Sequence, residues 1–148
     1  MAQGTSVRFG QQVLLIGDGG SPETFSAWCG ITSLTKTTNK ETGTVNMPDC
    51  EDPDLPGWLE IYLISNQMVI SGEGTLAQES LPDWDEWDRL GDLRNVRWYR
   101  NLTAGSGGGY YVGPAMLTTW EESAESRAPY TFSFGVTFNG KPTWVPAV

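Results

Sequence analysis

Histidine is absent from this chain of 148 residues, and only two cysteines are present, Cys29 and Cys50. Without histidine, a serine or cysteine nucleophile lacks its commonest general base, and Ser126 and Ser133 lie in no GxSxG motif. The cysteine spacing fits neither a CxxC redox motif nor a zinc site. We therefore expect two free thiols, with Cys29 in the core, and neither nucleophilic hydrolysis nor a cofactor.

Basic residues are also scarce, because nine Lys and Arg stand against 18 Asp and Glu, for a formal net charge of -9. Phosphate contacts from Lys and Arg supply most of the affinity for nucleic acids, so this charge argues against tight binding of DNA or RNA. A negative charge of this kind would suit a surface along which DNA moves without binding. Acidity also keeps many ordinary proteins soluble, so the charge alone does not decide between the two.

Long apolar runs are missing too, since none approaches the roughly 20 residues that span a bilayer. Residues 1–12 lack the apolar core of a signal peptide. We expect no membrane partner, and we expect the chain to be made and to fold in a cytoplasm.

The composition describes a folded protein with many turns, since 39% of the residues are hydrophobic and glycine and proline number 18 and nine. The length predicts one domain over residues 1–148. Two-residue alternation or short apolar runs predict strands at the following segments: Val13–Ile16, Thr24–Leu34, Trp58–Ile64 with Met68–Ile70, Asn95–Leu102, Tyr110–Trp120 and Tyr130–Phe138.

One helix is predicted, over Ser80–Gly91. Ser80 can cap it, Pro82 suits the first turn, and Gly91 ends it. Leu81, Trp84, Trp87 and Leu90 recur every three residues and form an apolar stripe that packs on the sheet.

The stretch from Ser33 to Leu63 is too long and too polar for an ordinary turn. Its threonines favour extended backbone, yet no face of Lys36–Asn46 carries enough apolar side chains to pack on a core of its own. The stretch is either a mobile surface loop or an extended arm that orders against another subunit. We favour the arm.

The remaining chemical signals are weak. Asp49, Glu51, Asp52 and Asp54 could offer oxygens to calcium, but their spacing is not that of an EF-hand and a solvated acidic turn explains them. Adjacent Glu121 and Glu122 would face opposite sides of a strand, unlike a glycosidase pair. Residues 105–109 read as a hairpin tip.

Seven tryptophans in an acidic β-rich chain would also suit a carbohydrate-binding module, in which aromatic faces stack on sugars. Core packing explains three of them. Trp58, Trp98, Trp120 and Trp144 remain as possible platforms, and none is clustered with Asn or Asp in a recognisable pattern.

The order of these features resembles a known family. A short β start, a threonine-rich arm closing on DCEDPDLPGWLE, a strand with ISGEGTL, one helix at LPDWDEWDRLGD and then long strands are similar to the major tail tube protein of phages with long non-contractile tails. The tubes of contractile tails and of type VI secretion are a close alternative. The resemblance implies a mainly β fold, a sandwich or barrel of two packed antiparallel sheets with one helix and a long loop or hairpin between early strands.

The resemblance further implies a structural protein that is not an enzyme. Six-fold rings stack into a tube, each subunit gives four strands to an inner barrel, and DNA slides through a negative lumen. Tape-measure, terminator and tail-tip proteins are the implied partners, and the tail of the virion is the implied location.

The arm, at about residues 35–57, is then expected to reach a neighbouring subunit or ring. Its expected interface residues are Lys36, Thr37, Thr38, Asn39, Lys40, Thr42, Thr44, Val45, Met47, Asp52, Asp54, Leu55 and Trp58. A lumen through which DNA slides should not present the positive charges of Arg94, Arg97 and Arg100, because they would bind phosphate. We predict that they face away from the lumen or pair with Asp52 or Asp54 of the next subunit, with Arg97 on the opposite face of its strand from the other two.

Overall fold

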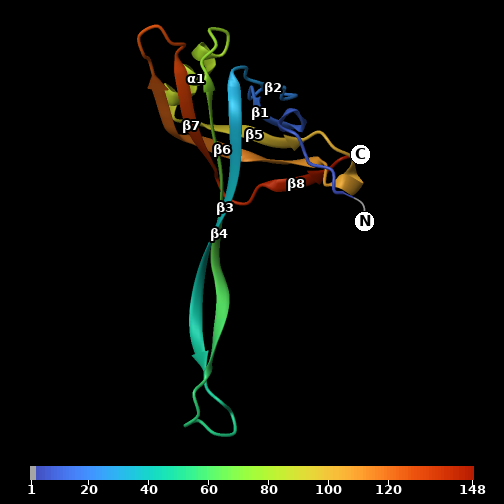
Figure 1. The fold of residues 1–148 in the computed structure, drawn as a ribbon, viewed down its shortest axis with the longest axis vertical. Coiled ribbons are helices and arrows are strands. Elements are labelled where there is room, and N and C mark those ends of the chain that lie inside the picture. The colour runs from blue at the N-terminus through green and yellow to red at the C-terminus, as the bar shows by residue number, and fades with distance from the viewer. Residues whose placement is uncertain (1–2) are drawn as a thin grey trace.

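The computed structural model describes residues 3–148 and divides into a body and a long projecting hairpin (Figure 1). The elements of the described chain follow in the order η1 (Phe9–Gln11), β1 (Gln12–Gly17), β2 (Phe25–Ala27), β3 (Ile31–Met47), β4 (Trp58–Thr75), α1 (Leu81–Leu90), β5 (Leu93–Arg100), η2 (Ala104–Ser106), β6 (Gly109–Ser123), β7 (Thr131–Phe138) and β8 (Thr143–Pro146). The mainly β fold with one α-helix and a long early hairpin is as expected.

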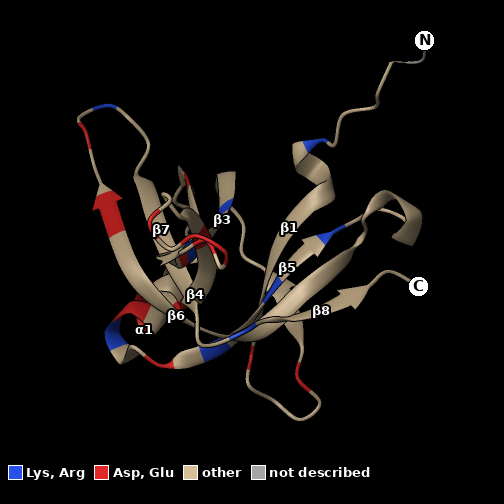
Figure 2. Ribbon diagram, turned by 90° about the horizontal axis from the view of Figure 1, so that it is seen from below, with Lys and Arg blue, Asp and Glu red and all other residues tan. Residues whose placement is uncertain are grey.

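The strands form one antiparallel sheet in the order β2-β1-β5-β6-β7-β4-β3, with β8 beside β6. The expected division into two separate sheets is therefore corrected. The reason lies in β6, which pairs with β5 and β8 through its first half and with β7 through its second half. This long strand joins the two halves of the sheet, which lie at an angle to each other (Figure 2).

The core fills the concave side of this bent sheet. Alternate residues of each strand face it, so that Ile16 lies opposite Val96, and Ile70 lies opposite Val136. All four are buried. The side chains of α1 close the same side, where the ring of Trp84 stacks on that of Trp120 at a centroid distance of 5.1 Å. The core therefore needs both halves of the sheet and the helix.

Helix α1 begins and ends as its sequence predicts. Pro82 lies in the first turn, and Gly91 ends the helix in the left-handed conformation, with a φ of 62°. The predicted cap by Ser80 is wrong, because its hydroxyl donates to the carbonyl oxygens of Cys29 and Ala77 instead. Leu90 is exposed, so the buried stripe consists mainly of Trp84 and Trp87.

The predicted strand Thr24–Leu34 is interrupted. β2 ends at Ala27, and β3 begins only at Ile31. Between them Gly30 has a φ of 101°, a backbone conformation that side chains rarely adopt. This break turns Cys29 outward, so the prediction of a core cysteine is wrong, and Cys29 and Cys50 are both free and exposed thiols.

The apolar segments Trp58–Ile64 and Met68–Ile70 belong to the single strand β4. β7 pairs only with Val69–Thr75 of this strand. The first ten residues of β4 extend beyond the body together with β3, and the large side chains at their start are exposed rather than buried. The predicted strand at Trp58–Ile64 is therefore part of the second strand of the projecting hairpin.

Candidate assembly interface

We call residues 39–67 the arm, because this part of the β3–β4 hairpin lies beyond the strand pairing of the body. Asn39 lies opposite Gln67, and Met47 opposite Trp58. The backbone of the threonine-rich strand is thus paired with β4 of the same chain, and contact of the arm with another subunit stays a prediction. The outer edges of both strands remain unpaired within the described residues.

A β-bulge decides which apolar residues share a face of the arm. Glu41 pairs with Ser65, but Thr42 pairs with Leu63, so Ile64 is an extra residue in β4. After this shift Leu59, Ile61 and Leu63 continue the face that carries Ile70 in the body. The bulge therefore extends the apolar face of the core along the arm, where none of residues 3–148 covers it.

The three aliphatic side chains on this first face of the arm are exposed by 70% at Leu59, 73% at Ile61 and 51% at Leu63. Exposed apolar surface that is continuous over several residues is typical of an interaction site. A single two-stranded ribbon buries little of its own surface, so this ribbon needs a partner to cover it.

The second face of the arm is aromatic. Tyr62 lies opposite Gly43, and a Cβ atom on Gly43 would come within 2.6 Å of the Tyr62 hydroxyl and Cζ. The ring therefore lies across the strand partner, in the space that a side chain would fill. Towards the tip Trp58 is 86% exposed opposite Met47. Both faces of the arm thus offer apolar surface.

The tip of the arm, residues 48–57, is an acidic turn. Asp49 Oδ1 accepts hydrogen bonds from the backbone amides of Glu51, at 2.8 Å, and Asp52, at 3.1 Å. Asp52 Oδ1 accepts one from the amide of Asp54 at 3.2 Å. Two carboxylates thus hold the turn, whereas the side chains of Glu51 and Asp54 make no hydrogen bond or ion pair within residues 3–148.

The expected interface residues are distributed along the hairpin. Lys36 and Thr37 lie in the body, opposite Ile70 and Val69. The others lie at the base of the arm, along β3, in the tip or at the start of β4: Thr38, Asn39, Lys40, Thr42, Thr44, Val45, Met47, Asp52, Asp54, Leu55 and Trp58. The sequence reasoning missed the exposed residues 59–64 on the second strand. The signal available in the sequence was that residues 59–64 lie close to the threonine-rich segment, which has no apolar face that could pack on a core.

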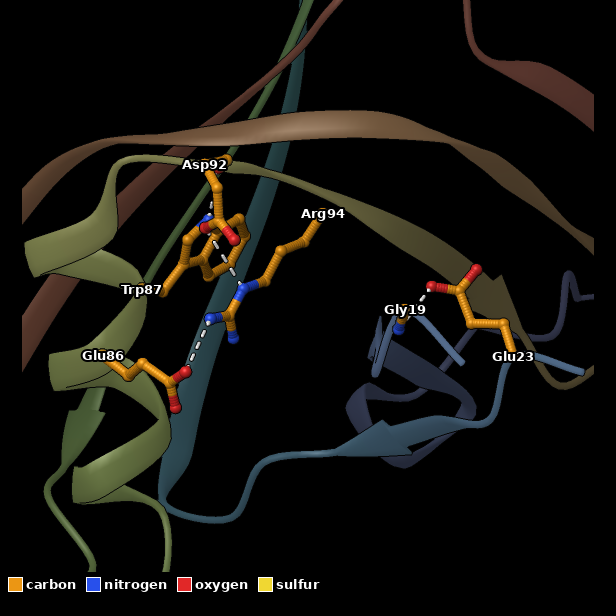
Figure 3. Close-up of polar contacts among 6 residues, drawn as sticks. All are labelled: Gly19, Glu23, Glu86, Trp87, Asp92 and Arg94. Atoms are coloured by element: carbon orange, nitrogen blue, oxygen red, sulfur yellow. Dashed lines mark hydrogen bonds and ion pairs between the residues drawn. The ribbon is translucent and has the colours of Figure 1, made fainter. Parts of the chain in front are cut away.

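The three arginines of β5 have different surroundings. Arg94 is partly buried near Trp87 and makes ion pairs with Glu86, at 3.8 Å, and Asp92, at 3.4 Å (Figure 3). The figure also shows Glu23, which accepts a hydrogen bond from the Gly19 amide within the β1–β2 turn. Arg94 is therefore already neutralised within its own chain.

Arg97 lies on the opposite face of β5 from Arg94 and Arg100, as the alternation predicts. Its guanidinium lies between two aromatic rings, 3.8 Å from the centroid of Phe25 and 4.6 Å from that of Tyr110. Its Nε is buried without a hydrogen-bond partner. Cation–π contacts on both sides thus hold this side chain in place.

Arg100 lies where the arm leaves the body, beside Lys36. Lys36 Nζ is 4.6 Å from the centroid of the Tyr111 ring, and the Arg100 guanidinium is 6.0 Å from the same ring. Burial, and secondarily the positive charge of Arg100, lower the pKa of Lys36. The expected pairing of these arginines with Asp52 or Asp54 of a neighbour stays a prediction.

No arrangement typical of an enzyme or metal site is found in the described residues. Glu122 accepts hydrogen bonds from Trp120 Nε1 and Tyr130 Oη, whereas Glu121 accepts one from Ser133. The bond to Glu122 raises the pKa of Tyr130. Residues 3–148 contain no group of three His, Cys, Asp or Glu placed to hold a metal and no helix long and apolar enough to cross a membrane.

The four tryptophans considered for sugar binding do not share a surface. Trp98 is buried, and Trp120 packs against the core. Trp144 contacts Tyr111 at a centroid distance of 4.7 Å with the two rings tilted by 50°, while Trp58 lies far away at the end of the arm. A common stacking platform is therefore not formed within the chain.

A mainly β body with a long hairpin whose apolar side chains are exposed is typical of a subunit that assembles with other copies. The model of the phage tail tube protein family matches residues 7–144, so the chain belongs to this family. It is accordingly a structural protein of the phage tail and not an enzyme. None of the curated proteins matches the chain in sequence.

Solved structures agree at the level of the fold. The tail of an empty gene transfer agent particle, refined with C6 symmetry, is similar with a TM-score of 0.76 at 14% identity, over 95% of this chain and 99% of the other. The SPP1 tail tube is similar with a TM-score of 0.68 at 7% identity, over 97% and 81%. The cap of the anti-feeding prophage tube has a TM-score of 0.61 at 11% identity, over 99% and 95%.

Proposed function

We propose that this protein polymerises as stacked hexameric rings into the tail tube of a phage with a long non-contractile tail, and that genomic DNA passes through the tube during ejection. The uncovered apolar arm is the observation that carries the proposal. The C6 symmetry of the gene transfer agent tail supports the six-fold ring, since the two folds are similar over nearly their whole lengths.

In this proposal the arm of one subunit lies against neighbouring subunits. Both of its faces carry exposed large apolar residues, and both of its strand edges have free backbone groups. Transfer of apolar area from water contributes about 25 cal/mol per Å² before the ordering costs are subtracted. A neighbour that covers Leu59, Ile61 and Leu63 therefore supplies a driving force that the isolated chain cannot realise.

The lumen is proposed to be lined by the face of β3, β4, β7 and β6 that points away from the core. Three lateral rows cross these four strands: Ser33-Glu73-Ser133-Glu121, Thr35-Ser71-Gly135-Thr119 and Thr37-Val69-Thr137-Met116. The rows contain hydroxyl groups and two carboxylates but no Lys or Arg. Lys36 is excluded from them because the strand period turns it to the core side.

This distribution of charge suits a channel for DNA. Phosphates bind tightly where Lys and Arg are available, and a wall of short hydroxyl side chains with a few carboxylates offers no such partners. The basic residues of β5 belong to the other half of the sheet (Figure 2). The proposal thus accommodates Arg94, Arg97 and Arg100 outside the lumen.

The finer partners follow from the same role. We propose tape-measure, terminator and tail-tip proteins as partners in the tail, and assembly in the host cytoplasm. The likeness to the anti-feeding prophage cap and baseplate structures supports partners at the tube ends, since these are proteins of similar fold in such positions.

The test is electron microscopy of the purified protein over a range of concentrations, with sedimentation to detect small rings. We expect hollow tubes whose end-on views have six-fold symmetry. A protein that stays monomeric at every concentration, or rings of another symmetry, would overturn the hexameric tube.

A further inference from the structure

Two cations meet at the base of the arm without a carboxylate. Lys36 comes from β3 and Arg100 from β5, strands that lie far apart in the order of the sheet. The bend of the sheet brings them together over Tyr111 and Trp144, where the Arg100 guanidinium is 5.7 Å from the Trp144 ring. Neither cation takes part in an ion pair within residues 3–148.

This pair is unusual for a chain with a net charge of -9, in which acids outnumber bases. Both side chains are partly buried, and their mutual repulsion contributes to the lowered pKa of Lys36. Like charges held together in a partly desolvated place cost free energy unless an anion compensates them. The site formed by Lys36 and Arg100 is therefore suited to bind a carboxylate.

The complementary group is present elsewhere in the same chain. The tip of the arm presents Glu51 and Asp54, whose carboxylates are exposed and bonded to nothing in the described chain, on a turn that Asp49 and Asp52 hold in shape. We propose that the tip of the arm of one subunit docks on the Lys36–Arg100 site of a subunit in the next ring. This inference rests on the proposed function, and it assigns the contact that joins successive rings.

Arg100, rather than Arg94 or Arg97, fits this contact. Arg94 already has two acidic partners of its own, and Arg97 is enclosed between two rings on the other face of the strand. The structure thus narrows the pairing expected from the sequence to one of the three arginines and adds Lys36.

The length of the arm gives the contact a geometric consequence. Met47 lies eleven positions after Lys36 in β3, and at about 3.3 Å per residue the hairpin places the start of its tip about 36 Å from its own Lys36. Successive rings repeat the same subunit, so a tip that meets the Lys36 site of the next ring requires an axial repeat no longer than this distance plus the length of the tip turn.

The decisive experiment uses two charge-reversed full-length chains, one with Lys36→Glu and Arg100→Glu and the other with Glu51→Lys and Asp54→Lys. The second pair spares Asp49 and Asp52, which hold the turn. We expect each chain alone to need a concentration at least about tenfold higher to form tubes. An equimolar mixture should assemble near the wild-type concentration, because each altered tip then finds an oppositely charged site on the other chain.

Lys141→Glu is the matched control, since Lys141 is an exposed cation close in sequence to Trp144 but has no cation–π contact or ion pair in the described chain. We expect it to assemble as the wild type does. Circular dichroism checks that every variant folds. Should the first pair fail to fold, the tip pair still decides, because its residues are exposed on a turn outside the body.

Normal assembly by either charge-reversed chain, or a mixture no better than its components, would overturn the tip contact while leaving the tube intact. A measured axial repeat longer than about 45 Å would also overturn it, because the tip could not reach the Lys36 site of the next ring. Failure of the wild type to form tubes is the separate result that would overturn the proposed function.

Discussion

The strands β3 and β4 run through two regions that treat the same kind of side chain in opposite ways. In the body, Ile70 of β4 is fully buried by the core. In the arm, Ile61 continues the same face and is 73% exposed. An apolar residue on a strand thus stabilises the fold of the subunit in the body, whereas in the arm it is exposed and, in our proposal, contacts another subunit.

The difference arises from what lies beside and above each part of the hairpin. β7 pairs with β4 only from Val69 onward, and α1 covers the core with Trp84 and Trp87. Beyond that boundary the described part of the chain gives the hairpin neither a third strand nor a covering layer. We infer that folding of the body and use of the arm are separable, and the following changes test this separation in order of expected effect.

Removal of the arm is expected to have the largest effect. Replacing residues 39–67 with Asn-Gly joins Thr38 to Met68, which lie opposite each other in the register and can be connected by a type I′ turn. We expect a folded monomer that forms no tubes at any concentration, as measured by sedimentation and electron microscopy.

A shorter deletion is the matched control for the arm. Replacing residues 48–57 with Asn-Gly removes the acidic tip but keeps both strands and their apolar faces, because Met47 lies opposite Trp58. Assembly should be weakened rather than abolished. Tubes from the chain without residues 39–67 would contradict the division into a folding body and an assembling arm.

Trp84→Ala is expected to have the largest effect on the body. The indole is fully buried among Trp28, Trp87, Trp120, Phe132 and Phe134. Loss of a buried aromatic side chain of this size costs about 3–5 kcal/mol in the free energy of unfolding. Denaturant unfolding of the armless chain measures it without interference from assembly, and a cost below about 1 kcal/mol would contradict the assigned core.

The parts of the fold that could be predicted from the sequence are those decided by contacts between residues close together in the chain. Helix α1 was predictable, because Pro82, Gly91 and the spacing of its tryptophans act within ten residues. The alternation in β5 and β7 likewise indicated strands with one buried face, and the apolar run Val13–Ile16 indicated the buried strand β1. The family resemblance was also accessible, from the order of these features along the chain. The threonine-rich segment, which has no apolar face of its own, indicated the first strand of the arm but not the second.

The failures share a physical cause. The apolar residues at Trp58–Ile64 look the same whether they are covered by the same chain or by another copy, so the sequence predicted a strand there but not that its side chains are exposed. The bulge at Ile64 and the break at Gly30 depend on pairing partners far away in the sequence. The meeting of Lys36 and Arg100 depends on the bend of the whole sheet, which no local pattern encodes.

Ile61→Ser is expected to have a moderate effect that is confined to assembly. Burial of an isoleucine side chain contributes about 2 kcal/mol, so its loss should raise the concentration needed for tube formation about thirtyfold. The midpoint of thermal unfolding should not change. Thr44→Ser, on the residue opposite Ile61, is the control with a small change on the same face; equal effects of the two variants on assembly would contradict an apolar contact there.

The smallest effect is expected from substitutions of the two aspartates that hold turns. Asp18 holds a turn in the body, and Asp49 holds a turn at the tip of the arm. Asp18 Oδ1 accepts hydrogen bonds from the amides of Gly20, at 2.8 Å, and Thr24, at 3.1 Å, and these bonds lower its pKa from the ordinary value of 3.8. A carboxylate with a lowered pKa in the folded state contributes stability above its unfolded pKa and loses this contribution as the pH falls through the folded value.

Asp18→Asn therefore should lower the free energy of unfolding slightly above about pH 4, and the difference from the wild type should shrink as the pH falls further. Unfolding by denaturant between pH 2 and pH 7, on the chain without residues 39–67, measures this difference. In the full-length chain, Asp49→Asn should leave the unfolding of the body unchanged at every pH, because its turn lies at the end of the arm. A pH-dependent loss of body stability in Asp49→Asn would show that the arm and the body fold as one unit, against the separation inferred from their burial.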